Sequence, residues 1–398
     1  MNNKNFIRTI EKNNEILIYN CINHNSIILN KKIYNMIKNF EDLEDFINLS
    51  KDYELDDRQF FVELGKKIKE QEIFSNSYKK ELHRINYIIT EFCNLQCSHC
   101  CRSAFYLNQP NNSNVIANID IIKKIVDYNP KEITITGGEP LIVKNLDEII
   151  NYLKYNYKGK VILSTNAILI NETNVKNLSD FFNGFDISID GINQEKCDEI
   201  RGEGTFCKVI KNIELLKKYN AKGISLSIAL DRRTRSDTEQ FIEMCKGLGV
   251  TPLIRRMSSL GRASDNGFDC EENNYDYFDT LLHEICNCPA GLSEFSVDYK
   301  GNAYPCNNFT NEKYNMGNIL HDDIIMYMEW SKENVWFKNF SQYVSITRDE
   351  CKECEVNMFC WHCPMIIKNF MESNKIDSLN NICANKKQKI YEVLWDGK

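Results

Sequence analysis

The sequence lacks an excess of positive charge and lacks long apolar runs, and each absence excludes a class of function. Its 398 residues carry a formal net charge of −7, and no basic patch is longer than Lys386-Lys387. General nucleic-acid binding needs clustered Lys and Arg, so no nucleic-acid partner is expected. No stretch approaches membrane-spanning length, and the first residues lack the apolar run of a signal peptide. We therefore expect a cytoplasmic protein with no membrane partner.

Cysteine, in contrast, is abundant, with 17 residues in the chain. In a secreted protein this number would predict disulfides, but the sequence has no export signal and is long enough to need no such crosslinks. Several cysteines are separated by only two to five residues, and nine of them follow residue 266. In a reducing compartment these spacings are typical of metal or cluster ligands.

Strand and helix patterns predict three domains, at residues 1–78, 79–270 and 271–398. In the first, β-like runs at 15–19 and 26–29 precede helical patterns at 31–40 and 57–71. A β-hairpin followed by helices fits a winged-helix-like module, with an N-terminal cap on the main domain as the alternative.

The middle domain alternates strand and helix patterns, which predicts an α/β fold. Six strands and four of the intervening helices are expected at 85–90, 132–136, 161–165, 185–189, 224–230 and 252–255, and at 119–128, 146–155, 207–218 and 238–248. Right-handed crossovers would curl such a parallel sheet into a partial (β/α)6 barrel, with the ligand site at the carboxyl ends of its strands. After about residue 266 the alternation is lost, and a loop-rich segment whose folding depends on metal is expected.

The first predicted barrel strand leads into a motif with the spacing C-x3-C-x2-C. Its members are Cys93, Cys97 and Cys100. Three thiolates on one loop can hold three irons of a 4Fe-4S cluster and leave the fourth iron open for a substrate. A zinc knuckle is the alternative. The spacing resembles the radical S-adenosylmethionine (SAM) superfamily, which implies a radical SAM barrel and a catalytic cluster.

Further residues match this family where barrel strands end. A Gly-Gly-Glu-Pro motif follows the second strand, and its glutamate is expected to contact the amino group of the methionine moiety. The resemblance implies that Ser164 and Asn166, after the third strand, contact ribose or methionine. It also implies that Ser188 and Arg201, after the fourth strand, contact the methionine carboxylate. A surface ion pair is the alternative for Arg201. The expected cofactor-binding residues are Gly137, Gly138, Glu139, Ser164, Asn166, Ser188 and Arg201.

The resemblance also implies the reaction. A one-electron donor, usually ferredoxin or flavodoxin, reduces the cluster, SAM is cleaved to methionine and a 5′-deoxyadenosyl radical, and this radical abstracts a hydrogen atom from the substrate. His99 is expected to tune the cluster through packing, and Cys101 to be a structural thiol.

The C-terminal cysteines resemble the SPASM extension, which carries auxiliary clusters in enzymes that modify peptides and proteins. The resemblance implies two auxiliary 4Fe-4S clusters, an outer one on Cys351, Cys354, Cys360 and Cys383 and an inner one on Cys288, Cys306 and Cys363. The fourth inner ligand is Cys286, or that iron stays open. Only two residues separate Cys360 from Cys363, where the family has three, and a two-zinc ribbon is the alternative.

The leading functional hypothesis is a peptide maturase. The N-terminal module resembles the element that captures leader peptides of ribosomally made precursors along a sheet edge. The modification expected is a thioether crosslink from a cysteine sulfur to an α-carbon. Peptide epimerisation, carbon–carbon crosslinking and sulfatase-type oxidation are alternatives, the last disfavoured because Asn307 stands where sulfatase maturases carry an aspartate. A non-catalytic iron–sulfur electron carrier is the alternative of a different class.

Overall fold

The computed structural model describes most of the chain. The described residues are 7–20, 26–38, 45, 48–49, 51, 55–70, 81–108, 114–231, 233–268, 288–328, 333–344, 348–351, 354, 356–357, 360, 362–373 and 375–396. No helix in these ranges is long and apolar enough to cross a membrane.

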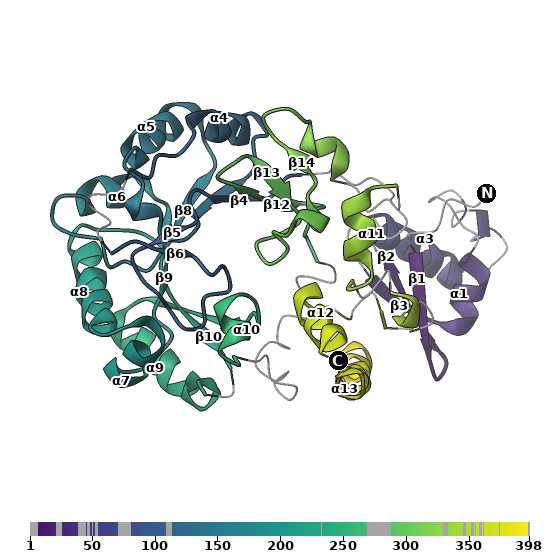
Figure 1. The fold of residues 1–398 in the computed structure, drawn as a ribbon. Coiled ribbons are helices and arrows are strands. Elements are labelled where there is room, and N and C mark those ends of the chain that lie inside the picture. Colours follow the sequence, from purple (N-terminus) through teal and green to yellow (C-terminus); the bar gives the residue numbers. More distant parts are fainter. Residues whose placement is uncertain are drawn as a thin grey trace.

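Six parallel strands form a curved sheet that is lined by helices (Figure 1). They are hydrogen-bonded neighbours in chain order: β4 (Arg84–Ile88), β7 (Glu132–Thr136), β8 (Lys160–Thr165), β9 (Gly184–Ser188), β10 (Ile224–Leu230) and β11 (Thr251–Arg256). The connecting helices lie on the outer side of the curve: α4 (Ile119–Asp127), α5 (Leu146–Asn156), α6 (Val175–Phe181), α7 (Gln194–Arg201), α8 (Thr205–Lys218) and α9 (Thr238–Leu248). The predicted partial (β/α)6 barrel is confirmed, and α6 and α7 are additions.

The barrel core lies between the sheet and these helices. Ile85, Ile133, Leu163 and Ile187 come from four neighbouring strands and are fully buried. Each helix buries one apolar face against them, as the 3.6-residue period requires. In α5 this face is made of Leu146, Ile149, Ile150 and Leu153. The packing holds the carboxyl ends of the strands in fixed positions, where the site is expected.

The C-terminal segment extends this sheet, which the sequence did not predict. Strand β12 (Glu294–Asp298) pairs in parallel with β4, and β13 (Asn302–Tyr304) and β14 (Gly317–Asn318) continue the sheet in antiparallel fashion to nine strands. The expectation of a loop-rich tail was wrong here: β13 and β14 have only three and two residues, too few to show a period, and the pairing of the five-residue β12 with β4 joins distant segments of the chain. Other elements are β5 (Phe92–Cys93), β6 (Phe105–Tyr106), α10 (Arg262–Asp265), α11 (Val335–Ser341), α12 (Pro364–Glu372), α13 (Ile376–Asp396) and short 3-10 turns at Pro140–Ile142, Arg235–Asp237, Glu312–Tyr314, Ile324–Tyr327 and Asp349–Cys351.

The N-terminal segment forms a separate small sheet with its own core. Strands β1 (Ile7–Lys12), β2 (Glu15–Asn20) and β3 (Ser26–Asn30) are antiparallel, and α1 (Lys31–Ile37) and α3 (Leu55–Glu70) follow. Their apolar side chains form one cluster: Ile16, Ile18, Ile27, Leu29, Ile37, Leu64 and Ile68. The predicted order of strands before helices is confirmed, and β1 turns the expected hairpin into a three-stranded sheet. The winged-helix-like identity stays a prediction.

Candidate active site

A cavity of about 520 Å³ opens at the carboxyl ends of the barrel strands. Its walls come from the loop after β4, from the ends of β7 to β11 and from the C-terminal segment. This is the edge of the sheet at which parallel α/β folds bind ligands. The cavity therefore lies where the sequence analysis expects the ligand site.

The three motif cysteines Cys93, Cys97 and Cys100 all line the cavity. The backbone N–H of Leu95 donates to Cys93 Sγ at 3.4 Å, and Asn166 Nδ2 lies 3.7 Å from the same sulfur. Burial raises the pKa of the Cys93 thiol to about 12 and also raises that of Cys97. A positively charged metal bound to these sulfurs would favour their deprotonated form. N–H groups close to the sulfur, as at Cys93, fit a cysteine that binds an iron–sulfur cluster.

The Gly-Gly-Glu-Pro motif packs against the strand that leads into the cysteine loop. The N–H groups of Gly138 and Glu139 donate to the carbonyls of Thr90 and Phe92, both at 2.8 Å. A Cβ on Gly138 would lie 2.0 Å from the Phe92 carbonyl oxygen, so only glycine allows this approach. Gly137 and Gly138 line the cavity as expected. Their closest approach, however, is to the backbone before Cys93.

The Glu139 carboxylate is turned into the protein, not toward the cavity. It is fully buried, accepts hydrogen bonds from Thr165 Oγ1 at 2.7 Å, from the Asn166 N–H at 2.8 Å and from the Leu141 N–H at 3.1 Å, and is absent from the cavity wall. A contact of Glu139 with the amino group of methionine stays a prediction. Glu139 holds Asn166, whose side chain reaches Asn94 Oδ1 at 2.9 Å.

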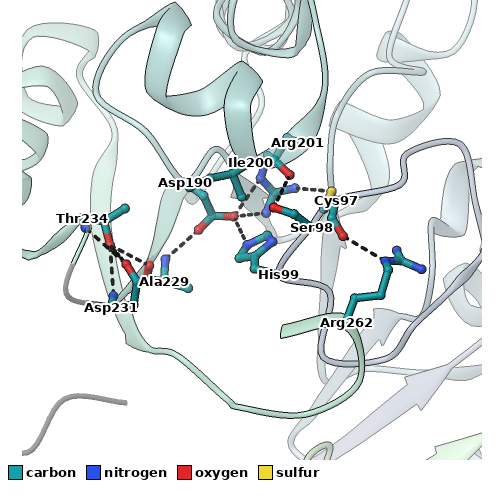
Figure 2. Close-up of polar contacts among 10 residues, drawn as sticks. All are labelled: Cys97, Ser98, His99, Asp190, Ile200, Arg201, Ala229, Asp231, Thr234 and Arg262. Atoms are coloured by element: carbon teal, nitrogen blue, oxygen red, sulfur yellow. Dashed lines mark hydrogen bonds and ion pairs between the residues drawn. The ribbon is translucent and has the colours of Figure 1, made fainter. Parts of the chain in front are cut away.

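Asp190, which follows β9, joins the cysteine loop to α7 (Figure 2). Its Oδ2 accepts from Arg201 Nε at 2.7 Å and lies 2.6 Å from His99 Nε2, and its Oδ1 accepts from the Ala229 N–H at 2.6 Å. Burial raises the pKa of Asp190, but the charge of Arg201 and the bond from His99 outweigh it and hold the pKa well below its usual range. Because the ionised carboxylate only accepts, His99 Nε2 carries a proton.

Arg201 is part of this network. Its Nε and Nη2 both bind Asp190, and Nη1 lies 4.0 Å from Cys97 Sγ. Asp190 takes two of the five guanidinium donors, and the contact of Arg201 with the methionine carboxylate stays a prediction. Arg201 is buried and lines the cavity, so a surface ion pair is excluded. Sequence reasoning identified Ser188 but missed Asp190, two residues later, as the residue that joins the two segments.

The remaining predicted contacts, Ser164 and Ser188, also lie in the cavity wall. Behind Ser164, Asp186 forms an ion pair with Arg255, another residue of the wall. Ser164 Oγ lies 3.5 Å from Asp186 Oδ2. With Asn166, all predicted SAM contacts except Glu139 face the cavity. Their roles toward SAM stay predictions.

The segment around α10 holds the cysteine loop from its outer side. Arg262 Nε donates to the Cys97 carbonyl at 2.9 Å (Figure 2). Arg262 Nη1 donates to the Ala104 carbonyl at 3.0 Å, and Asn266 Nδ2 to the Ser98 carbonyl at 2.8 Å. Sequence reasoning missed these residues, because no local pattern shows that a segment 160 residues further along binds the loop.

The two sets of C-terminal cysteines stay a prediction, and the pKa directions of two members agree with it. In the inner set, Cys306 and Cys363 both raise the pKa of Cys288, after the larger effect of burial. In the outer set, the neighbouring thiols that raise the pKa of Cys360, again after burial, are Cys383, Cys351 and Cys354. Cys286 lies outside the described residues. In the ranges that the structure describes, no three His, Cys, Asp or Glu side chains converge as they would on a single metal ion.

Comparison with known proteins agrees with this geometry. Residues 87–245 match the model of the radical SAM superfamily. The mycofactocin maturase MftC of Mycolicibacterium smegmatis is 25% identical over 280 residues, which cover 63% of this chain and 69% of that protein. The subtilosin biosynthesis protein AlbA of Bacillus subtilis is 27% identical over 277 residues, covering 62% and 59%.

Among solved structures, Streptococcus suis SuiB bound to the precursor peptide SuiA has the same fold. The TM-score is 0.52 at 13% identity, over 89% of this chain and 93% of SuiB. The superfamily match includes the cysteine motif, the Gly-Gly-Glu-Pro motif and the Asp190 network. Residues 87–245 therefore form a radical SAM domain, and the chain is a radical SAM enzyme that is similar to the maturase MftC and to the biosynthesis protein AlbA.

Proposed function

We propose that this enzyme modifies a ribosomally made precursor peptide, by abstracting a hydrogen atom from one of its residues and directing a thioether crosslink. The observation that carries the proposal is the shape of the site. One cavity is lined by the three motif cysteines and also by Cys363 of the inner auxiliary set. A substrate in this cavity would touch both the SAM side and the auxiliary side.

The chain's residues divide the work of the site. Cys93, Cys97 and Cys100 would hold the catalytic 4Fe-4S cluster, which supplies the electron that cleaves SAM. Asp190 fixes His99 and Arg201 beside this loop, and Glu139 fixes Asn166. The C-terminal sets would hold two auxiliary clusters, with Cys286 or an open iron completing the inner one. A ferredoxin or a flavodoxin is the proposed electron donor.

The relatives favour a peptide as substrate. MftC is named as a maturase of mycofactocin and AlbA as a biosynthesis protein of the bacteriocin subtilosin, and both align over more than 60% of this chain. In the described part of the chain, Asn307 accepts bonds from Arg102 and Ser296 through its amide oxygen. An amide is no carboxylate base, so this geometry also disfavours sulfatase-type oxidation.

Formation of 5′-deoxyadenosine tests the enzymatic part of the proposal. The reconstituted, reduced protein is incubated with SAM under anaerobic conditions, and the products are separated by chromatography. We expect 5′-deoxyadenosine and methionine in equal amounts even without peptide. A reduced protein with intact clusters that forms neither product would instead be an electron carrier.

The N-terminal sheet is the proposed site of leader recognition. Strand β3 pairs only with β2 among the described strands, so its other edge offers backbone groups to an extended peptide. The module has its own apolar core, which supports its assignment as a domain at residues 1–78.

Removal of residues 1–78 should weaken binding of the cognate precursor at least tenfold and leave peptide-independent SAM cleavage within about twofold, because the cavity draws no residue from this module. Fluorescence anisotropy of the labelled precursor measures the first quantity and chromatography the second. Unchanged precursor affinity would return the module to the role of a structural cap.

A further inference from the structure

Four arginines line the cavity of the active site, and no carboxylate does so among the described residues. Two of these arginines form ion pairs with carboxylates that do not line the cavity: Arg201 with Asp190 and Arg255 with Asp186. Arg102 differs from both. No carboxylate of the described chain forms an ion pair with it, and its hydrogen bonds go to Asn307, from Nη2 to the side-chain oxygen at 3.1 Å and to the carbonyl at 3.4 Å.

Arg102 lies between the cysteine motif and the inner auxiliary set. It follows Cys100 and Cys101 directly, and Asn307 follows Cys306 of the inner auxiliary set. The Arg102 guanidinium is only partly buried there and stays charged, so a carboxylate that enters the cavity would form an ion pair with it.

Asn307 supplies a second donor beside this guanidinium. Its Oδ1 accepts from Arg102 Nη2 at 3.1 Å and from Ser296 Oγ at 3.0 Å, and these two donors fix the orientation of the amide. Its Nδ2 is then left as a donor, with no acceptor among the described side chains and backbone groups. An aspartate in place of Asn307 would put a carboxylate against Arg102 and fill the site from within.

We propose that Arg102 and Asn307 bind a carboxylate group of the peptide substrate at the boundary between the SAM cavity and the inner auxiliary cysteines. This inference rests on the proposed function and adds a chemical requirement to it, because the residue presented for modification would lie close to a carboxylate. Both an acidic side chain and the C-terminal carboxylate of the peptide have this chemistry. An arginine fork with an adjacent amide donor matches the planar, two-oxygen geometry of either.

Two pairs of short peptides test the proposal on the SAM-loaded holoenzyme. The first pair is a tripeptide capped at both ends with a central aspartate, and its asparagine counterpart. The second is N-acetylated trialanine with a free C-terminal carboxylate, and its C-terminal amide. In at least one pair the carboxylate peptide should bind roughly tenfold more tightly than its neutral counterpart, and that pair identifies the source of the carboxylate. Equal affinities within both pairs would overturn the proposal.

Variants assign the preference to this site. Both Arg102→Gln and Asn307→Asp should bring the two affinities to within about twofold, the first by removing the cation and the second by occupying it. Arg84→Gln is the charge-matched control, because Arg84 pairs with Glu132 at the opposite ends of the barrel strands, and it should keep the full preference. Asn307→Asp is nearly isosteric, so it remains informative if loss of Arg102 disturbs folding.

Two further outcomes would contradict the assignment. A preference that persists in both variants places the carboxylate elsewhere. If Arg102→Gln loses affinity for SAM but keeps the preference for the carboxylate peptide, Arg102 binds the SAM carboxylate instead of the peptide. Formation of 5′-deoxyadenosine without peptide is measured on the same wild-type preparation. If it occurs while the preference is absent, only this inference fails and the enzymatic assignment stands.

Discussion

Replacing Cys93, Cys97 and Cys100 together by alanine is expected to abolish SAM cleavage and to remove about four of about twelve irons per chain, at four irons per cluster. The reason is geometric, since all three thiols line the cavity and the other predicted cluster ligands belong to the C-terminal sets. Iron and sulfide analysis with electron paramagnetic resonance on anaerobically purified protein measures the loss. Absorbance from the auxiliary clusters should persist.

A matched control removes three cysteines outside these sets. Cys197, Cys207 and Cys245 lie on α7, α8 and α9 and outside the cavity wall. Their combined replacement by alanine should leave both the iron content and SAM cleavage in place. Cleavage that survives in the first variant, or a tail that holds zinc in the wild type, would refute the assignment of the clusters.

Asp190→Asn is expected to lower the free energy of unfolding by about 3–5 kcal/mol, because it leaves the Arg201 guanidinium buried with no compensating carboxylate. Chemical denaturation followed by circular dichroism measures the change. Asp180→Asn, an exposed position on α6, should change stability by about 0.5 kcal/mol or less. A double variant that also carries Arg201→Met should recover part of the loss.

The same network predicts the sign of a pH effect. The pKa of Asp190 is lower in the folded chain than in the unfolded one, where it is about 3.9. Its contribution to stability is therefore complete above this unfolded value and is lost as the pH falls toward the folded one. Between pH 5 and pH 3 the wild type should lose more stability than Asp190→Asn. Parallel acid profiles for the two proteins would show that Asp190 is not the group responsible.

The barrel and the position of its site were predictable because both follow from local patterns. Alternation of apolar strands such as 132–136 with amphipathic helices such as 146–155 identifies a parallel sheet, and its connections fix which ends of the strands carry the site. The cysteine spacings are likewise local. Cys93, Cys97 and Cys100 lie within eight residues, so their convergence needed no knowledge of tertiary structure.

What the sequence could not reveal are contacts between distant segments. The bonds from Arg262 to the cysteine loop, from Asp190 to His99, and from Arg102 to Asn307 each join residues separated by more than 90 positions. Contacts between such distant residues produce no periodic pattern in the sequence. The direction of the Glu139 carboxylate was equally hidden, because a motif gives the residue type but not which of its neighbours will donate to it.

The parallel pairing of β12 with β4 has a consequence for how this protein unfolds. The C-terminal segment is joined to the first barrel strand by a run of backbone hydrogen bonds from Glu294↔Arg84 to Asp298↔Ile88. The predicted domain boundary near residue 270 therefore does not divide the sheet, because strands from both sides of it are paired. Deleting the tail would expose the whole edge of β4, and such unpaired edges recruit other chains. Amide hydrogens of β4 and β12 should exchange together, in one cooperative opening of both segments.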